Sequence, residues 1–207
     1  ETPQFQPLLP FFDLLYGQPT QCYFFDSNGH LDSFQQDEGV AQGCPLGPIF
    51  AALCLSILLK ELLADLHDRA KQRSLHGDPG DDGYGTKASS SSYIDDTSIF
   101  LHPCDLQYCL TRFTDLGKPL GIALNKTKTK IFTNLQGVPA VDLPSYPYKA
   151  EVQACLSYLS DPSQPNHCSE ITTGTRFLGQ PLGTVTFANQ FLSQAAATYT
   201  ANVSSLT

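Results

Sequence analysis

The sequence predicts an α+β fold, in which an antiparallel sheet carries helices on one face. Three observations support this class. Residues 20–36 and 93–101 each show a strand–turn–strand pattern, and the first contains Asn28-Gly29, a strong hairpin turn. Residues 49–72 repeat apolar side chains at helical spacing over a broad face. A second helical pattern covers residues 105–116, and we expect both helices to pack on the same face of the sheet.

The remaining elements have weaker patterns. Residues 1–15 are expected to form a loop or a helix end, and residues 73–92 a polar loop rich in Gly, Ser and Asp. One short helix is expected near residues 150–159, within an otherwise irregular, proline-rich stretch. Residues 176–183 indicate a strand and a turn, and the chain becomes helical again from Phe187.

Composition limits the function classes open to the chain. Its 207 residues carry a formal net charge of −8, which excludes a surface that binds nucleic acid through bulk positive charge alone. The seven cysteines form no CxxC pair, so a zinc site is not expected and the thiols are expected to be reduced.

No segment indicates a secreted or membrane protein. The longest apolar run, Ile49–Leu59, is too short to cross a bilayer, and no signal peptide is visible. We therefore expect an intracellular protein, in the nucleus or the cytoplasm, with no membrane partner. The chain contains no Met and opens on Glu1, so we expect it to be a fragment of a longer protein.

Two adjacent carboxylates, Asp95 and Asp96, follow Tyr93-Ile94 in the middle of a predicted hairpin. Two ionised carboxylates about 4 Å apart repel by roughly 1 kcal/mol in water, and by more when they are partly desolvated. One interpretation is a simple turn, where Asp is common. The other is a divalent cation, since Mg²⁺ prefers one or two protein carboxylates together with water and substrate phosphates. The second interpretation suits metal-assisted phosphoryl or nucleotidyl transfer.

The segment Glu38–Pro48, EGVAQGCPLGP, combines three glycines with two prolines directly before a predicted helix. Glycines let a backbone approach another molecule closely, and the first amides of a helix favour phosphate. A plain loop before a buried helix explains the same residues. The segment is not a Walker A loop, because the Gly-Lys-Ser/Thr ending is absent.

A local positive patch lies in the acidic chain, because no Asp or Glu occurs between Gly117 and Val141. The patch contains Lys118, Lys126, Lys128 and Lys130. These lysines suit contact with phosphate, or equally a solvated edge strand that they protect from aggregation.

In this order the segments resemble the reverse transcriptases of non-LTR retrotransposons and, more distantly, group II intron enzymes. Gly39–Pro48 resembles motif B of that family, and Tyr93–Asp96 resembles the YxDD box of motif C. Gly121–Thr129 resembles motif D, with its LNxxKT pattern, and Phe177–Gly183 resembles motif E, the primer grip. The resemblance spans nearly all of residues 16–195.

The resemblance implies a catalytic centre at the YxDD box. Asp95 would be the metal ligand that helps bind two Mg²⁺ ions, with Mn²⁺ as an alternative, and Asp96 would be its weaker partner. Both residues would serve as catalytic and metal-binding residues, and Tyr93 would lie near the 3′ end of the primer. The reaction would be attack of the primer 3′-hydroxyl on the α-phosphate of a dNTP, with release of pyrophosphate.

The resemblance also implies an RNA template, a DNA or RNA primer and dNTPs as partners. The residues expected against template and incoming nucleotide are Gly39, Gln42, Gly43 and Pro45, with Lys128 near the nucleotide phosphates. The residues expected in the primer grip are Leu178, Gly179, Pro181 and Gly183.

The family also requires motif A, which supplies a further metal-binding Asp upstream of motif B. Asp26 follows an apolar strand, but turn residues come after it and it lies only 13 residues before Gly39. We therefore expect residues 1–187 to form a partial polymerase palm with motifs B to E, and residues 188–207 to begin a thumb or connection helix. The fingers, most of the thumb and an N-terminal part of the same protein would be missing, so the chain alone is expected to be inactive.

Three other readings stay open. A catalytically dead palm retained as a nucleic-acid-binding or scaffold module would explain the missing motif A. A viral RNA-dependent RNA polymerase shares the palm, but usually shows Gly-Asp-Asp where this chain has Ile94-Asp95-Asp96. A protein unrelated to nucleic acid would keep the two carboxylates as an acidic turn.

Overall fold

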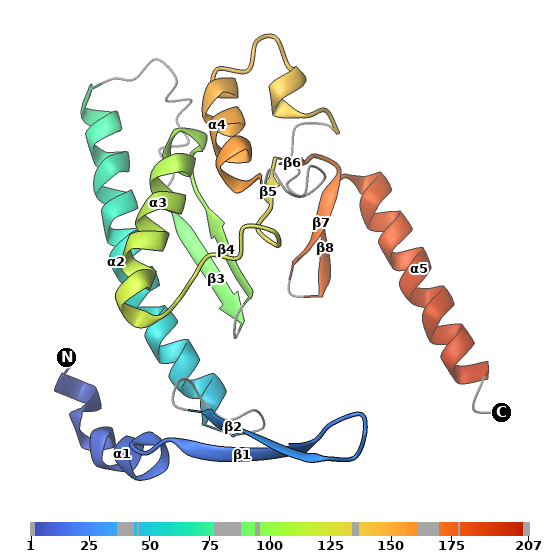
Figure 1. Ribbon diagram of the computed structural model, residues 1–207. Coiled ribbons are helices and arrows are strands. Elements are labelled where there is room, and N and C mark those ends of the chain that lie inside the picture. Colours follow the sequence, from blue (N-terminus) through green and yellow to red (C-terminus); the bar gives the residue numbers. More distant parts are fainter. Residues whose placement is uncertain are drawn as a thin grey trace. The chain divides into compact units, whose positions relative to one another are not determined.

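The computed structural model describes residues 3–36, 44, 46–76, 88–93, 96–133, 137–160, 170–177 and 179–204 (Figure 1). The chain divides into two compact units, Glu1–Ala51 and Ala52–Thr207. Helix α2, Gly47–His76, begins in the first unit and continues into the second. In the described part of the chain, no helix combines the length and apolar character needed to cross a membrane.

The first unit contains a helical segment and a hairpin. Its elements are η1 (Pro3–Leu8), α1 (Leu9–Tyr16), β1 (Thr20–Phe25) and β2 (Leu31–Gln36). The two strands pair antiparallel from Thr20↔Gln36 to Phe25↔Leu31, which confirms the hairpin predicted for residues 20–36. Helix α1 packs through Phe12, whose ring centroid lies 4.0 Å from that of Phe50 at the start of α2.

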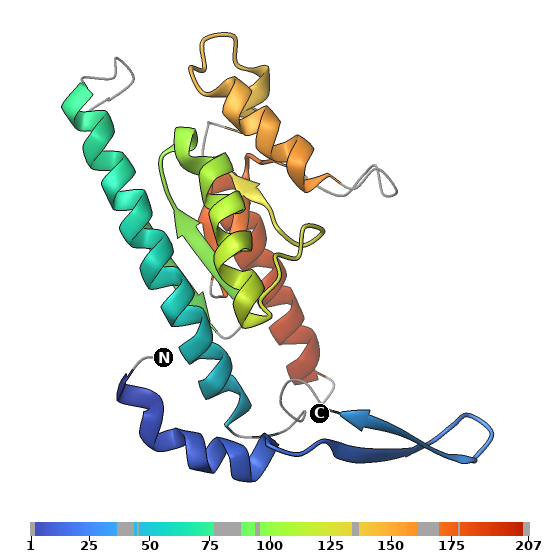
Figure 2. The ribbon, with the colours of Figure 1, turned by 60° about the vertical axis from the view of Figure 1, so that its left-hand side comes forward.

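The second unit is built around α2, α3 (Leu106–Gly117) and a hairpin of β3 (Ser89–Tyr93) and β4 (Asp96–Phe100). Figure 1 and Figure 2 both show α2 and α3 running side by side. The buried residues of this core are Leu55, Leu58, Leu59, Leu62 and Leu66 of α2, Ala88 before β3, and Cys109 and Phe113 of α3. Ile99 of β4 packs against them, so both helices cover the hairpin, as the sequence predicts.

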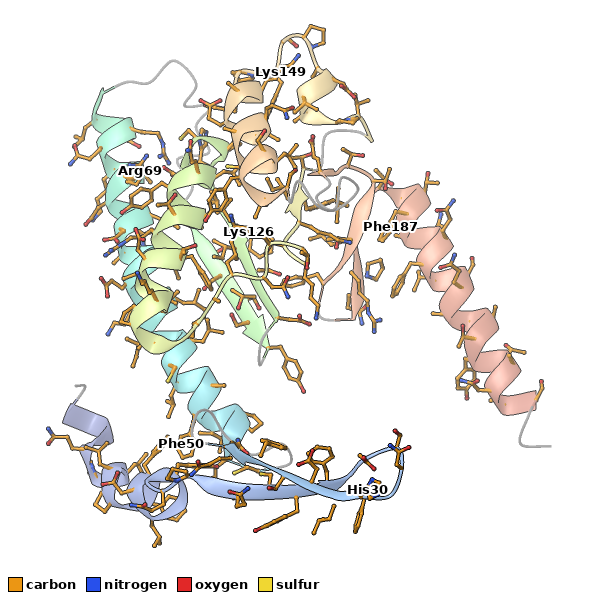
Figure 3. The ribbon with its side chains drawn as sticks, viewed as in Figure 1. His30, Phe50, Arg69, Lys126, Lys149 and Phe187 are labelled. Carbon is orange, nitrogen blue, oxygen red and sulfur yellow. The ribbon has the colours of Figure 1, made fainter. Side chains whose placement is uncertain are left out.

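Charged side chains also join α2 to the start of α3. The carboxylate of Asp105, only 2% exposed, accepts hydrogen bonds from Arg69 Nε at 2.9 Å and from Arg73 Nη1 at 2.6 Å. Figure 3 labels Arg69 on α2, where its guanidinium lies 4.3 Å from the ring centroid of Tyr108. Farther along α3, Arg112 donates hydrogen bonds to two carboxylates of α2. These contacts hold the two helices in one relative position, against which the hairpin packs.

The rest of the second unit follows α3. Its elements are η3 (Lys118–Leu120), β5 (Ile131–Phe132), η4 (Ala140–Asp142), α4 (Lys149–Leu159), β6 (Glu170–Ile171), β7 (Gly174–Phe177), β8 (Gln180–Gly183) and α5 (Val185–Ser204), with η2 (Pro103–Asp105) preceding α3. A second apolar cluster joins Ile131 of β5 to Cys155 and Leu159 of α4. The helix predicted near 150–159 is thus confirmed, and the final helix begins two residues before Phe187.

The prediction of a single antiparallel sheet is wrong. The described strands form four separate two-stranded sheets, β1–β2, β3–β4, β5–β6 and β7–β8, and the β5–β6 pair is parallel. Three of these sheets are local hairpins, which close short loops at low entropic cost. A wider sheet needs strands from distant segments, and the described residues supply none at these edges. The mixed α and β composition itself agrees with the prediction.

The loop predicted for residues 73–92 is also wrong at both ends, and residues 77–87 lie outside the described part. Helix α2 continues to His76, and β3 begins at Ser89. The run of serines hides the strand because it lacks an apolar alternation. Its partner strand supplies the apolar side chains instead, with Ser90 opposite Ile99.

Candidate functional site

The β3–β4 hairpin presents its last pair of residues to solvent. The strands pair from Ser89↔Phe100 to Tyr93↔Asp96, and this register leaves only Ile94 and Asp95 between them. Tyr93 is 66% exposed, and Asp96 is exposed as well. Ile94 and Asp95 lie outside the described residues. The chain therefore carries one exposed carboxylate directly beside Asp95, at the end of a short hairpin.

The hairpin is held at its base. Ile99 packs into the core under α2 and α3, and Phe100 meets the ring of Phe177 in β7 edge-to-face, at 5.7 Å between centroids. Nearer the Tyr93–Asp96 pair, Ser92 Oγ donates a hydrogen bond to Thr97 Oγ1 across the strands at 3.0 Å. The packing of Ile99 and Phe100, together with the hydrogen bond across the strands, fixes the position of Asp96.

A tight turn, residues 125–129, presents the lysine that the sequence assigns to phosphate. The Oδ1 atom of Asn125 accepts hydrogen bonds from Thr127 Oγ1 at 2.8 Å and from Lys128 N at 3.2 Å. The carbonyl oxygen of Asn125 accepts from Thr129 N at 2.9 Å and Thr129 Oγ1 at 2.8 Å. The side chain of Lys128 is exposed. Asn125 thus organises the backbone on which Lys128 stands.

The β7–β8 hairpin holds three of the four residues expected in the primer grip. Gly179, Pro181 and Gly183 lie on it together, and Leu178 is outside the described residues. Gly179 adopts a φ of +83°, which favours glycine in the turn. Gly183 pairs with Gly174, and a Cβ at Gly183 would lie 2.3 Å from the Cα of Gly174. Close backbone approach therefore requires Gly183, whatever else the residue contacts.

A family model described as reverse transcriptase (RNA-dependent DNA polymerase) matches residues 9–182, most of the chain. The chain belongs to the reverse transcriptase family. No curated protein and no solved structure matches it. The match begins in α1 and ends within β8, so it includes the β3–β4 hairpin, the turn at residues 125–129 and the β7–β8 hairpin as far as Leu182. Membership of the reverse transcriptases, predicted from the motifs, is thus confirmed, and the non-LTR type stays a prediction.

Reverse transcriptases are in general RNA-directed DNA polymerases, which act on nucleic acid and nucleotides and use divalent metal ions. In the described part of this reverse transcriptase, no group of three or more His, Cys, Asp and Glu side chains is placed to hold a metal ion. Asp96 is the one expected metal ligand within that part. Asp96 follows Asp95 directly in the sequence, and its exposed carboxylate offers the oxygen ligands that Mg²⁺ prefers.

Six of the ten residues predicted to form motif B lie outside the described residues, among them Gly39, Gln42, Gly43 and Pro45. Cys44 is described, and its Sγ lies 2.7 Å from the hydroxyl of Tyr16. This hydrogen bond, together with backbone amides at the start of α2, lowers the pKa of the Cys44 thiol. The sequence gives no sign of the contact, because 28 residues separate its partners and no motif links them.

Asp26 has a structural position in the β1–β2 loop, as the sequence predicts. Its Oδ1 atom accepts hydrogen bonds from the amides of Asn28 and His30, each at 2.8 Å. Its own amide donates to the carbonyl of His30 at 2.9 Å. These bonds, that of the His30 amide foremost, lower the pKa of Asp26. A carboxylate that closes a turn in this way is a poor match for the metal ligand of motif A.

Proposed function

We propose that this chain is the part of a non-LTR retrotransposon-type reverse transcriptase that carries motifs B to E of the palm. In the complete protein it contributes the YxDD carboxylates to template-directed DNA synthesis from RNA. The observation that carries the proposal is the β3–β4 register, which ends at Tyr93↔Asp96 and places exposed side chains on both sides of Ile94-Asp95. Membership of the reverse transcriptase family supports the same chemistry.

In this proposal Asp95 and Asp96 hold the metal. When bound there, two Mg²⁺ ions, or Mn²⁺, would supply positive charge for activation of a primer 3′-hydroxyl and for the departure of pyrophosphate. Asp95 is the stronger ligand and Asp96 its partner. Tyr93, exposed beside them, lies against the 3′ end of the primer. Lys128 places its exposed ammonium against the phosphates of the incoming nucleotide.

The chain alone does not polymerise, in our proposal. The complete site needs a motif A carboxylate, and Asp26 is held in its turn by two amide hydrogen bonds. Without that carboxylate, the charge of two cations is not compensated, and tight binding of both is not expected. We propose that the missing ligand comes from another part of the same polypeptide, together with the fingers and most of the thumb.

A catalytically dead palm, kept as a nucleic-acid-binding or scaffold module, is the second candidate. It is favoured by the lack of a recognisable motif A before residues 39–48 of the sequence. The intact Asp95-Asp96 pair argues against it.

Primer extension on an RNA template, with dNTPs and Mg²⁺, separates the two candidates. Three proteins are compared: this chain, the same chain with Asp95→Ala, and a longer form that includes motif A. We expect extension by the longer form alone. Extension by the short chain that is lost with Asp95→Ala would refute the missing motif A, and Asp26 would become the suspected ligand. If none of the three proteins extends the primer, the catalytically dead palm is favoured.

A further inference from the structure

Lys126, labelled in Figure 3, lies in the turn at residues 125–129 and contacts helix α4. Its Nζ lies 3.9 Å from the centroid of the Tyr158 ring and donates a hydrogen bond to the Tyr158 carbonyl oxygen at 3.2 Å. A cation over the face of a tyrosine ring is attracted by the ring quadrupole. One residue, Tyr158, therefore holds the Lys126 ammonium twice, through its side chain and through its backbone.

The helix that offers Tyr158 is firmly placed. Val152, Cys155 and Leu159 of α4 are fully buried, and α4 packs against α3. Tyr158 itself is partly buried and packs against the second apolar cluster, as Leu124 does. Leu124 directly precedes the turn and packs against both apolar clusters. The turn is thus anchored at its start by Leu124 and along its side by Lys126.

The two lysines of the turn have different surroundings. Lys126 is bound to Tyr158, whereas the described residues include no hydrogen bond or ion pair from the ammonium of Lys128. The backbone of Lys128 is fixed all the same, because its amide hydrogen lies between the carbonyl oxygen and the Oδ1 atom of Asn125, each 3.2 Å from the nitrogen. The geometry therefore leaves one lysine to hold the turn and one to meet a ligand.

We propose that Tyr158 is a positioning residue for the incoming nucleotide. By holding Lys126, it fixes the turn that presents Lys128 to the nucleotide phosphates. The proposal rests on the proposed function for its ligand, since the phosphates are those of a dNTP. Asn125 determines the conformation of the turn, and Tyr158 determines the position of the turn relative to α4. Without the ring, Lys126 keeps only its hydrogen bond to the Tyr158 carbonyl oxygen, and Lys128 samples more positions.

The first test measures the turn itself, by hydrogen exchange of the full 207-residue chain. Tyr158→Ala removes the ring and keeps the backbone carbonyl, whereas Tyr158→Phe keeps both. We expect Tyr158→Ala to speed exchange of the Lys128 and Thr129 amides, and Tyr158→Phe to leave it unchanged. Ser157→Ala, an exposed neighbour on α4, is the matched control. Unchanged exchange in Tyr158→Ala, with α4 still protected, would overturn the proposal.

The second test measures steady-state dNTP incorporation in the longer form that contains motif A. We expect Tyr158→Ala to raise the KM for dNTP about threefold, the effect of losing one exposed cation–π contact, with little change in kcat. Tyr158→Phe keeps the ring and should keep the wild-type KM. If the Tyr158 hydroxyl were the important group, Tyr158→Phe would change the KM as well. In a Lys128→Ala background, Tyr158→Ala should add no further increase.

The two tests fail in different ways. An active enzyme in which Tyr158→Ala leaves the KM unchanged, or adds its full effect to Lys128→Ala, overturns the positioning role. A longer form without any incorporation overturns the proposed function, and with it the assignment of a nucleotide as the ligand. Faster exchange of the turn in Tyr158→Ala would then stand as a property of the fold alone.

Discussion

Tyr93 and Asp96 form the last cross-strand pair of the β3–β4 hairpin, and only Ile94 and Asp95 lie between them. This pair is the last one of the described hairpin, and both of its side chains are exposed. Exposed Tyr93 and exposed Asp96 therefore mark the position at which the YxDD box meets its substrates in our proposal.

The ion cluster around Asp105 should contribute to the stability of the second unit. Asp105→Asn removes the charge that Arg69 and Arg73 share, and we expect the free energy of unfolding to fall by about 2 kcal/mol. This free-energy value is reduced because the Arg69 side chain is 44% exposed and keeps access to water. Urea unfolding followed by circular dichroism measures the change.

The exposed pair of Asp68 and Lys71 provides the control for that experiment. Both side chains are more than 70% exposed, so Asp68→Asn should change the free energy of unfolding by less than about 1 kcal/mol. Equal effects of Asp105→Asn and Asp68→Asn would contradict the structural role given to the buried carboxylate.

The packing of β7 against α5 leaves no room for a side chain at Gly174. A Cβ built there would lie 2.2 Å from Cδ1 of Phe187. We expect Gly174→Ala to destabilise the protein by about 1–3 kcal/mol, as overpacking does, and to lower the midpoint of thermal unfolding. In a Phe187→Ala background the same substitution should cost much less, because the clashing ring is gone. Additive effects of the two changes would show that the ring does not restrict Gly174.

Cys44 should react with alkylating reagents faster than the two buried thiols. The hydroxyl of Tyr16 lowers its pKa, whereas burial raises the pKa of Cys109 to about 12 and that of Cys155 to about 11. Because the thiolate is the nucleophile, iodoacetamide at pH 7–8 should label Cys44 before Cys109 and Cys155, as peptide mass spectrometry can follow.

Tyr16→Phe tests the cause of that reactivity. The substitution keeps the ring and removes the hydrogen bond at 2.7 Å, so the pKa of Cys44 should rise and its labelling should slow at a given pH. The rate should still increase with pH, with its midpoint shifted upward. Labelling at an unchanged rate in Tyr16→Phe would assign the reactivity to the backbone amides alone.

The β1–β2 loop should lose a stabilising contribution in acid. The pKa of Asp26 is lower in the folded chain than its ordinary value, mainly because the His30 amide donates to the carboxylate. The contribution is therefore present above the ordinary carboxyl pKa and is lost as pH falls through the lowered value. Amide chemical shifts of Asn28 and His30 report the titration. In Asp26→Asn both shifts should stay constant over the same range, and a surviving titration would point to another group.

Local signals made much of this fold predictable. Asn28-Gly29 specifies a hairpin by itself, and the leucines of α2 repeat every three or four residues over one face. The start of β3 at Ser89 was missed because serines carry no apolar pattern, although their partner strand does. The number of sheets was missed because strand pairing between distant segments leaves no local mark.

Motif spacing made part of the candidate site predictable, and long-range contacts made up the rest. Lys128 was assigned from the LNxxKT pattern, yet the pattern does not reveal that Asn125 closes the turn beneath it. The contact of Lys126 with Tyr158 joins residues 32 apart, and no periodicity connects them. Asp95 stays a prediction, because it lies outside the described residues.

The role of Asp95 as a metal ligand can be measured by single-turnover incorporation of one dNTP by the longer form containing motif A. Asp95→Asn keeps the size of the side chain and removes the charge that would hold Mg²⁺. We predict a loss of about a thousandfold or more in rate, since a metal ion supplies several kcal/mol of charge stabilisation. Asp68→Asn, an exposed carboxylate on α2, should keep the full rate. Incorporation by Asp95→Asn at the rate of the unchanged enzyme would contradict the account.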